Sequence, residues 1–245
     1  MEENCLISKY QLTPLLIETH KLHEMLQDPS NLEKMRIVDS SFFLPTDVRK
    51  APVEYEKERI PYSIFFDVDE IADKSRDLPH MLIQDEKEFT KWMKKLDIRT
   101  TDVIICYDRI GVFSSPRLWF NLTVYGVKNV FVLNGGYPKW VKDGYPVEKE
   151  HSNYVRAPLV EGFDYKYNSG FVFSYDEIGD RQVIDARCKE RYLGKAPEPR
   201  PTIHQGHYKG AKCIFFKEVV DTNWCYKSKE EILKVIRDNE IDLEK

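Results

Sequence analysis

Short runs of apolar, β-branched residues alternate along the chain with longer stretches in which apolar residues recur every three or four positions. The periodic stretches predict amphipathic helices at 89–96 and, after the Ser-Pro start signal, at 115–126. The apolar runs predict buried strands at 35–39, 103–107 and 130–133. Strands that alternate with helices of this length imply an α/β fold, a parallel sheet covered on both faces.

A further helix is expected near the start of the chain. Thr13 can cap a helix, and Pro14 suits its first position because the missing N–H has no intrahelical partner there. Leu15, Leu22 and Leu26 would then fall on one face.

The second half of the chain repeats the pattern of the first. The run 183–185 echoes 37–39, since both end in an aspartate, and 207–216 echoes 59–66. We therefore expect an internal duplication with a first domain at 1–150, a linker at 151–170 that mixes Pro, Gly and aromatic residues, and a second domain at 171–245.

The repeat also predicts what the second domain should still contain. Asp108 follows Ile98 by ten positions, and Ile241 is the counterpart of Ile98. The equivalent strand end is expected at about position 251, beyond Lys245, where α/β sheets carry their sites. A further stretch of chain or a protein partner is expected to complete this domain.

Charge and hydropathy exclude some classes of function. The 245 residues carry a formal net charge of -4, which disfavours nucleic acid as a partner but permits a small anionic substrate in a local basic pocket. No apolar run reaches the ~18 residues of a membrane helix. The acidic start, Met1-Glu2-Glu3-Asn4, favours a cytoplasmic protein, with a mitochondrial one as the alternative.

Five widely spaced cysteines, with no CxxC pair, predict free thiols and no zinc site, and no cofactor is expected. Cys106 lies inside a predicted strand, two residues before Asp108. Cys188 lies beside Arg187, but neither cysteine is followed by a loop of small residues that could hold a thiolate.

Several motifs, taken together and in this order, resemble those of two-domain rhodaneses. They are Phe65-Phe66-Asp67-Val68-Asp69, Leu78-Pro79-His80-Met81-Leu82, Ser115-Pro116-Arg117-Leu118-Trp119, Asp185-Ala186-Arg187, Arg191-Tyr192-Leu193-Gly194 and Pro197-Glu198-Pro199-Arg200. The resemblance covers almost the whole chain and is closest to the 3-mercaptopyruvate sulfurtransferases. It implies two tandem rhodanese-like domains, the first without catalytic activity. Tyr62 stands where the family usually has glycine, which affects the local turn.

The resemblance also implies a chemistry and its residues. Sulfur passes from 3-mercaptopyruvate, or from thiosulfate, to a cysteine persulfide and then to a thiol acceptor such as a thioredoxin, or to cyanide. Arg191 and Arg200 match the substrate-binding arginines, and Asp69 and His80 match the first domain's share of a proton relay. The nucleophilic cysteine is expected just beyond Lys245, so the 245 residues alone are expected to be inactive.

Two alternatives stay open at this point. The chain could be a non-catalytic rhodanese-like scaffold or a subunit of a larger assembly. A nucleotide-binding protein is a weaker alternative, because Asn134-Gly135-Gly136 follows a predicted strand but no GxGxxG or GxxxxGK[ST] pattern is present.

Overall fold

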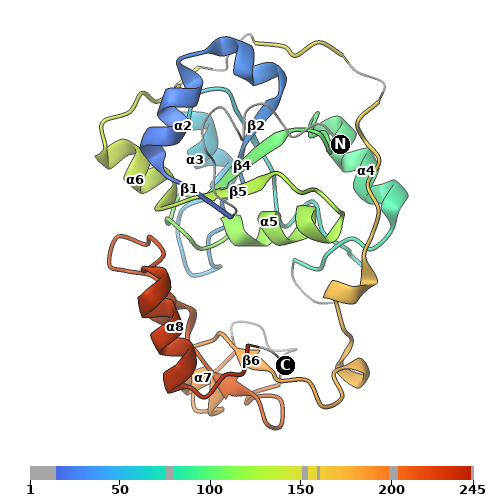
Figure 1. Cartoon of the computed structure of the whole chain (residues 1–245), viewed down its shortest axis with the longest axis vertical. Coiled ribbons are helices and arrows are strands. Elements are labelled where there is room, and N and C mark those ends of the chain that lie inside the picture. The colour runs from blue at the N-terminus through green and yellow to red at the C-terminus, as the bar shows by residue number, and fades with distance from the viewer. Residues whose placement is uncertain (1–14, 76–79, 151–153, 159–160, 199–203, 244–245) are drawn as a thin grey trace. The chain divides into compact units, whose positions relative to one another are not determined.

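A computed structural model describes residues 15–75, 80–150, 154–158, 161–198 and 204–243 of the chain (Figure 1). The chain divides into two compact units, 1–171 and 172–245, and each is described by itself.

The first unit is built on a parallel five-stranded sheet with the strand order β1-β5-β4-β2-β3. Its strands are β1 (Leu15–Ile17), β2 (Met35–Asp39), β3 (Ser63–Phe65), β4 (Val103–Tyr107) and β5 (Val130–Leu133). Every residue of β4 is buried, because helices cover this central strand on both faces. The register pairs Asp39 with Tyr107, so β2 and β4 end at the same edge of the sheet.

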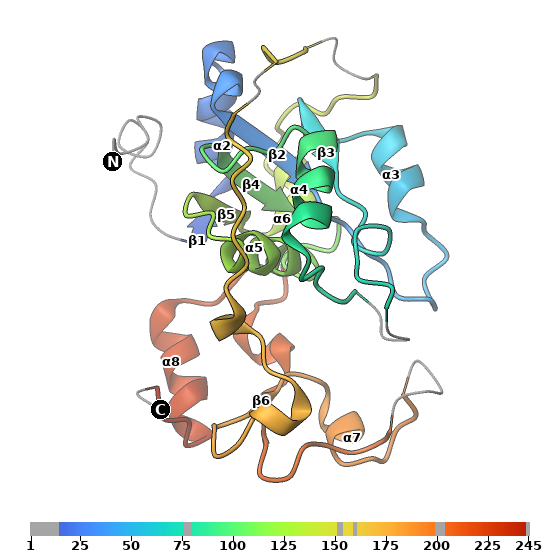
Figure 2. The ribbon, with the colours of Figure 1, turned by 90° about the vertical axis from the view of Figure 1, so that its right-hand side faces the viewer.

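Helices cover the two faces of this sheet, as Figures 1 and 2 show. The helices are α2 (Thr19–Leu26), α3 (Ala51–Lys57), α4 (Glu86–Lys95), α5 (Ser115–Val124) and α6 (Gly136–Lys142). Leu22 of α2 and Trp140 of α6 belong to the core on one face of the sheet. Leu118 and Leu122 of α5 and Phe89 of α4 are buried on the other. The α/β architecture predicted from the alternating pattern is confirmed.

The prediction of a helix that begins at Pro14 is wrong. Thr13 and Pro14 lie outside the described residues, and Leu15 belongs to β1, where it pairs with Phe131 of β5. The helix begins only at Thr19. The local start signal does not decide this segment, because pairing with β5 satisfies its backbone groups at the edge of the sheet.

Tyr62 keeps the turn for which a glycine was expected. Its φ of 62° lies in the left-handed region, which costs a residue with a side chain about 1–2 kcal/mol. The Tyr62 N–H donates to Glu148 Oε2 at 2.9 Å, and this bond helps to hold the strained turn. The substitution changes the cost of the turn and leaves the fold intact.

The stretch expected to be a linker, 151–170, falls within the first unit. Arg156 binds Asp102 through two nitrogens, at 2.9 and 2.5 Å, and the Tyr165 hydroxyl donates to the Ile98 carbonyl at 2.7 Å. Both Arg156 and Tyr165 are buried. The described part of 151–170 is therefore packed structure.

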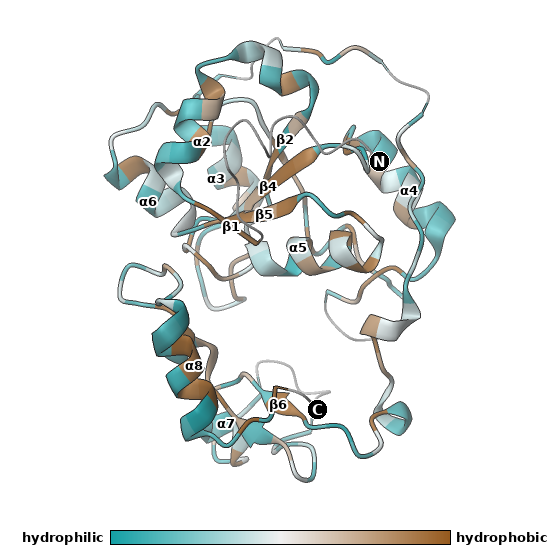
Figure 3. Cartoon of the chain, viewed as in Figure 1, coloured by the Kyte–Doolittle hydropathy of each residue, from teal (hydrophilic) through white to brown (hydrophobic). Residues whose placement is uncertain are grey.

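The second unit has a smaller core within its described residues. A two-stranded parallel sheet pairs β6 (Ile184–Asp185) with β7 (Lys212–Cys213), and the helices are α7 (Lys189–Tyr192) and α8 (Lys229–Asp238). Ser228 and Glu231 form a capping box at the start of α8. Figure 3 shows apolar and polar positions side by side on α8. The buried apolar residues here are Ala211, Ile214, Val220 and Ile241.

Candidate functional site

Asp69 and His80, which the sequence analysis assigned to a proton relay, meet in the first unit. His80 Nδ1 lies 2.9 Å from Asp69 Oδ1. The Asp67 carboxylate accepts the N–H of Asp69 at 2.9 Å and so shapes the turn that presents it. The His80 side chain is only 18% exposed and packs edge-on against Phe42, with ring centroids 4.4 Å apart. The carboxylate thus stands within ion-pair distance of one ring nitrogen, which is the separation that an acid–base pair requires.

Arg191, one of the two predicted donor-binding arginines, lies in an ion-pair network of the second unit. Its Nη2 is 2.5 Å from Oε2 of Glu198, whose side chain is 2% exposed. The other oxygen of Glu198 accepts from Arg187 Nη1 at 2.8 Å. One buried carboxylate thus holds two guanidinium groups side by side. Arg200 lies outside the described residues.

Arg187 extends this network to the end of β6. It donates from Nε to Asp185 Oδ1 at 2.9 Å and from Nη2 to the Gly206 carbonyl at 2.6 Å. The hydrogen bonds from Arg187 lower the pKa of Asp185, and those to Asp185 raise the pKa of Arg187. The roles of Arg187 and Glu198 were missed at the sequence level, although both stand inside the quoted motifs. Ion pairing across 11 residues has no sequence signature of its own.

The end of β4, where the first unit would carry a nucleophile if it had one, is filled by Asp108. Its Oδ2 accepts the backbone N–H groups of Phe113, Ser114 and Ser115, at 2.8–2.9 Å. Its Oδ1 accepts those of Ile110 and Gly111, at 2.9 and 3.0 Å. The Ser115 hydroxyl adds a sixth hydrogen bond at 2.7 Å. A loop of converging N–H groups at the start of α5 is an anion cradle, and here the chain's own carboxylate fills it.

A second buried acid stands beside it at the same sheet edge. Asp39, at the end of β2, is fully buried and lies 3.2 Å from Arg109 Nε. Burial raises the pKa of Asp39, while the Arg109 charge and the Ser41 hydroxyl oppose that rise. The guanidinium of Arg109 also stacks over the Tyr137 ring at 4.4 Å. The carboxyl edge of the first unit is thus closed by internal ion pairs and hydrogen bonds.

Two of the described cysteines, Cys106 and Cys213, are shifted away from the thiolate. Burial raises the pKa of the Cys106 thiol well above its ordinary value, and that side chain is fully buried in β4. Burial also raises the pKa of Cys213, whose Sγ faces the Arg187 carbonyl at 3.6 Å. Cys188 precedes the four-residue helix α7. A reactive thiol needs the opposite shift, toward the thiolate.

The described ranges hold no group of three or more His, Cys, Asp or Glu side chains arranged to bind a metal ion. Within them, none of the helices has the length and apolar character needed to cross a membrane.

Comparison with known proteins agrees with this fold. The profile of the rhodanese-like domain family matches residues 20–143. This chain belongs to the rhodanese family. It is 33% identical over 249 residues to the Arabidopsis thaliana thiosulfate/3-mercaptopyruvate sulfurtransferase 1, mitochondrial, covering 91% of this chain and 64% of that relative. It is 29% identical to the 3-mercaptopyruvate sulfurtransferase of Mus musculus, covering 96% of this chain and 80% of that protein.

Among solved structures, the chain superimposes on the Escherichia coli 3-mercaptopyruvate sulfurtransferase SseA with a TM-score of 0.80. That match is 26% identical and covers 94% of this chain and 85% of the bacterial one. The match covers 64% of the length of the Arabidopsis thaliana relative and 80% of the length of the Mus musculus relative. Two tandem rhodanese-like domains fit these relatives.

Proposed function

We propose that this rhodanese-family protein takes part in sulfur transfer from 3-mercaptopyruvate or thiosulfate to a thiol acceptor. The observation that carries the proposal is the identity of about one third to a thiosulfate/3-mercaptopyruvate sulfurtransferase across 91% of the chain. The Asp69–His80 contact at 2.9 Å supports it from the geometry, because that pair stood in the sequence motifs from which the relay was expected.

The chemistry assigns separate tasks to these residues. A thiolate attacks the donor's sulfur, the sulfur becomes the outer atom of a persulfide, and the donor leaves as sulfite or, after its carbon accepts a proton, as pyruvate. Asp69 and His80 would supply that proton for 3-mercaptopyruvate. Arg191, held by Glu198, and Arg200 would bind the anionic donor, since planar guanidinium groups suit a carboxylate.

We further propose that none of the chain's own cysteines is the nucleophile. Support comes from Cys106 and Cys213, because burial favours the neutral thiol at both positions. On this proposal, the 245 residues alone bind a donor but do not form a persulfide. The acceptor is proposed to be a thiol such as that of a thioredoxin, and residence in the cytoplasm, rather than mitochondria, is a proposal that cell fractionation tests.

The test compares two samples with each donor in the presence of excess dithiothreitol. The protein isolated from its natural source is expected to release pyruvate from 3-mercaptopyruvate or sulfite from thiosulfate. The recombinant 245-residue chain is expected to release neither. A natural protein inactive with both donors would favour the non-catalytic scaffold. Turnover by the recombinant chain, lost on changing Cys106, Cys188, Cys213 or Cys225 to serine, would overturn the cysteine assignment.

A further inference from the structure

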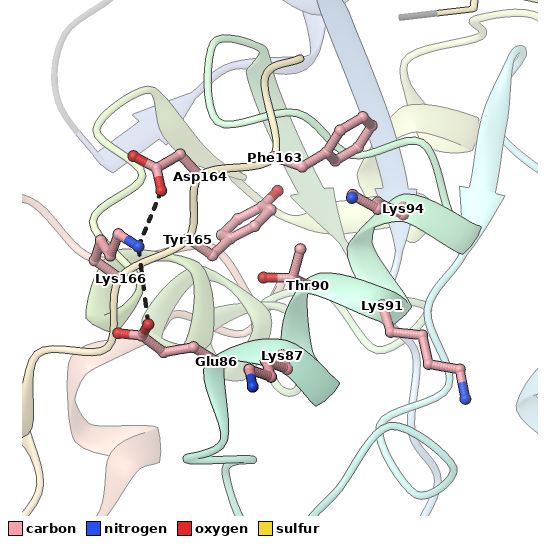
Figure 4. Close-up of a pocket in the computed structure, with 9 residues that line it drawn as sticks. All are labelled: Glu86, Lys87, Thr90, Lys91, Lys94, Phe163, Asp164, Tyr165 and Lys166. Carbon is pink, nitrogen blue, oxygen red and sulfur yellow. Dashed lines mark ion pairs between the residues drawn. The ribbon is translucent and has the colours of Figure 1, made fainter. Parts of the chain in front are cut away.

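Two adjoining hollows on the first unit form one continuous groove beside α4. Their volumes are about 510 and 580 Å³, and they share Lys94 and Phe163 as lining residues. One wall is α4, and the other is the segment from 154 to 158 and from 163 to 166. Figure 4 shows the part of the groove between α4 and residues 163–166.

The floor of the groove is aromatic and fixed. Tyr165 is 2% exposed, and its hydroxyl is tied to the Ile98 carbonyl at 2.7 Å. Its ring meets Phe89 of α4 edge-on, with centroids 5.3 Å apart. Phe163 is half-buried, and Lys94 Nζ lies 5.8 Å from the centre of its ring. A ligand would therefore meet a preformed surface with little ordering cost.

At one end of the groove, three guanidinium groups crowd around one carboxylate. Asp97 is 2.8 Å from Arg36 Nη2, 2.9 Å from Arg99 Nε and 3.7 Å from Arg156 Nε. Asp102 pairs with Arg156 from beneath. Burial lowers the pKa of Arg36 and the charge of Arg156 adds to that effect, while Asp97 and Asp102 oppose it. Glu33 also acts on Arg156 and accepts the Tyr154 hydroxyl at 2.5 Å, so three guanidinium groups meet three carboxylates and this end of the groove is close to neutral.

The positive excess of the groove comes from lysines along α4. Lys166 is neutralised by Asp164 at 3.1 Å and Glu86 at 3.9 Å, and Figure 4 shows its ammonium between them. The other three lysines that line this part of the groove are Lys87, Lys91 and Lys94. All three are exposed, and within the described ranges they make no ion pair with a carboxylate. The groove is lined by seven cationic side chains and three carboxylates, on a chain whose net charge is -4.

We propose that this groove is a docking site for an extended acidic segment of a partner protein. Lys87, Lys91 and Lys94 stand at i, i+4 and i+7, so their Cα atoms are spaced about 6 and 4.5 Å along the helix axis. Alternate side chains of an extended peptide recur about every 6.6 Å. A segment with acidic residues at alternate positions therefore comes close to the Lys87–Lys91 interval, and the long lysine side chains span the larger difference at Lys94. Its backbone would lie over Phe163.

A protein segment fits better than nucleic acid. The net charge of -4 disfavours a long polyanion such as nucleic acid, which would extend beyond the lysines of the groove. A short acidic peptide needs only the local charges. The proposal is independent of the donor chemistry, because none of the groove residues belongs to the proposed relay or donor site.

The experiment measures fluorescence anisotropy of a rhodamine-labelled peptide of about ten residues with alternating Glu and Ala. The full 245-residue chain is compared with K87E/K91E/K94E and with K50E/K128E/K149E, a matched control that reverses three exposed lysines elsewhere on the same unit. Folding of each variant is checked by circular dichroism. If the glutamate variant does not fold, K87Q/K91Q/K94Q replaces it.

We expect the groove variant to bind the Glu-Ala peptide about tenfold more weakly, as three exposed ion pairs allow, and the control to bind within about twofold of the original chain. A Gln-Ala peptide is expected not to bind, and raising salt from about 0.05 to 0.5 M should weaken the Glu-Ala complex. Equal loss in both triple variants, no loss in the groove variant, or tighter groove-dependent binding of an oligouridylate of similar length would each overturn the proposal.

Discussion

Arg191 Nη2 lies 2.5 Å from Glu198 Oε2, and the same carboxylate holds Arg187 with its other oxygen at 2.8 Å. Glu198 is therefore the centre of the ion-pair network in the second unit. The arrangement positions Arg191 and also partly neutralises it, so an anionic donor would have to compete with Glu198 for the guanidinium or bind its outer edge.

Replacing Glu198 by alanine should destabilise the second unit. The change removes the carboxylate that Arg191 binds and leaves Arg187 with Asp185 alone, and breaking a buried pair costs about 3–5 kcal/mol. Because the side chains of Arg187 and Arg191 are 27% and 29% exposed, the expected loss of unfolding free energy lies toward the lower end of this range. Hydrogen–deuterium exchange of peptides from the second unit in rising urea measures the loss. Glu190→Ala, an exposed change on α7, is the control and should cost less than about 0.5 kcal/mol.

Asp108→Ala should destabilise the first unit severely. It removes the acceptor of five backbone N–H groups, and each buried group left without a partner costs about 1–3 kcal/mol. Ser115→Ala removes only the sixth bond and should cost about 1–2 kcal/mol. Thermal unfolding by calorimetry compares the two. Similar melting temperatures for both variants would show that the cradle does not depend on the carboxylate.

Asp69→Asn and His80→Gln should slow turnover of 3-mercaptopyruvate in the active protein while sparing thiosulfate. Only the keto acid needs a proton on its leaving carbon, and a positioned acid–base group contributes about 10²- to 10⁴-fold. Steady-state assays of kcat with both donors measure the difference. Glu70→Gln, an exposed neighbour, is the control. Equal slowing with both donors would assign the pair a structural role instead of a proton relay.

Arg200→Asp in the active protein should raise KM for 3-mercaptopyruvate far more than for thiosulfate. The loss of a charge-assisted contact to the carboxylate corresponds to about 1.5–3 kcal/mol, or roughly 10- to 150-fold. Arg200 lies outside the described residues, so this prediction rests on the motif Pro197-Glu198-Pro199-Arg200. Equal effects on both donors would contradict the claim that Arg200 selects between them.

The pattern of apolar residues was sufficient for three of the five strands of the first sheet. The runs 35–39, 103–107 and 130–133 match β2, β4 and β5 residue for residue, because a strand covered on both faces is mainly apolar. The edge strand β1 escaped this reasoning. It has only three residues, Leu15–Ile17, and its conformation is set by hydrogen bonds to β5, more than 110 positions away.

The candidate site divides in the same way. The motifs by themselves named Asp69, His80 and Arg191, since these residue types stand in a fixed local order. Only the tertiary structure decided that Asp69 and His80 lie 2.9 Å apart, that Glu198 holds Arg191, and that Asp108 fills its own loop. It also decided that 154–158 and 163–166 pack beside α4 to form a basic groove. The sequence specifies which side chains are present and how they are spaced along the chain. Which charged groups from distant segments pair depends on how the sheet and its helices bring those segments together.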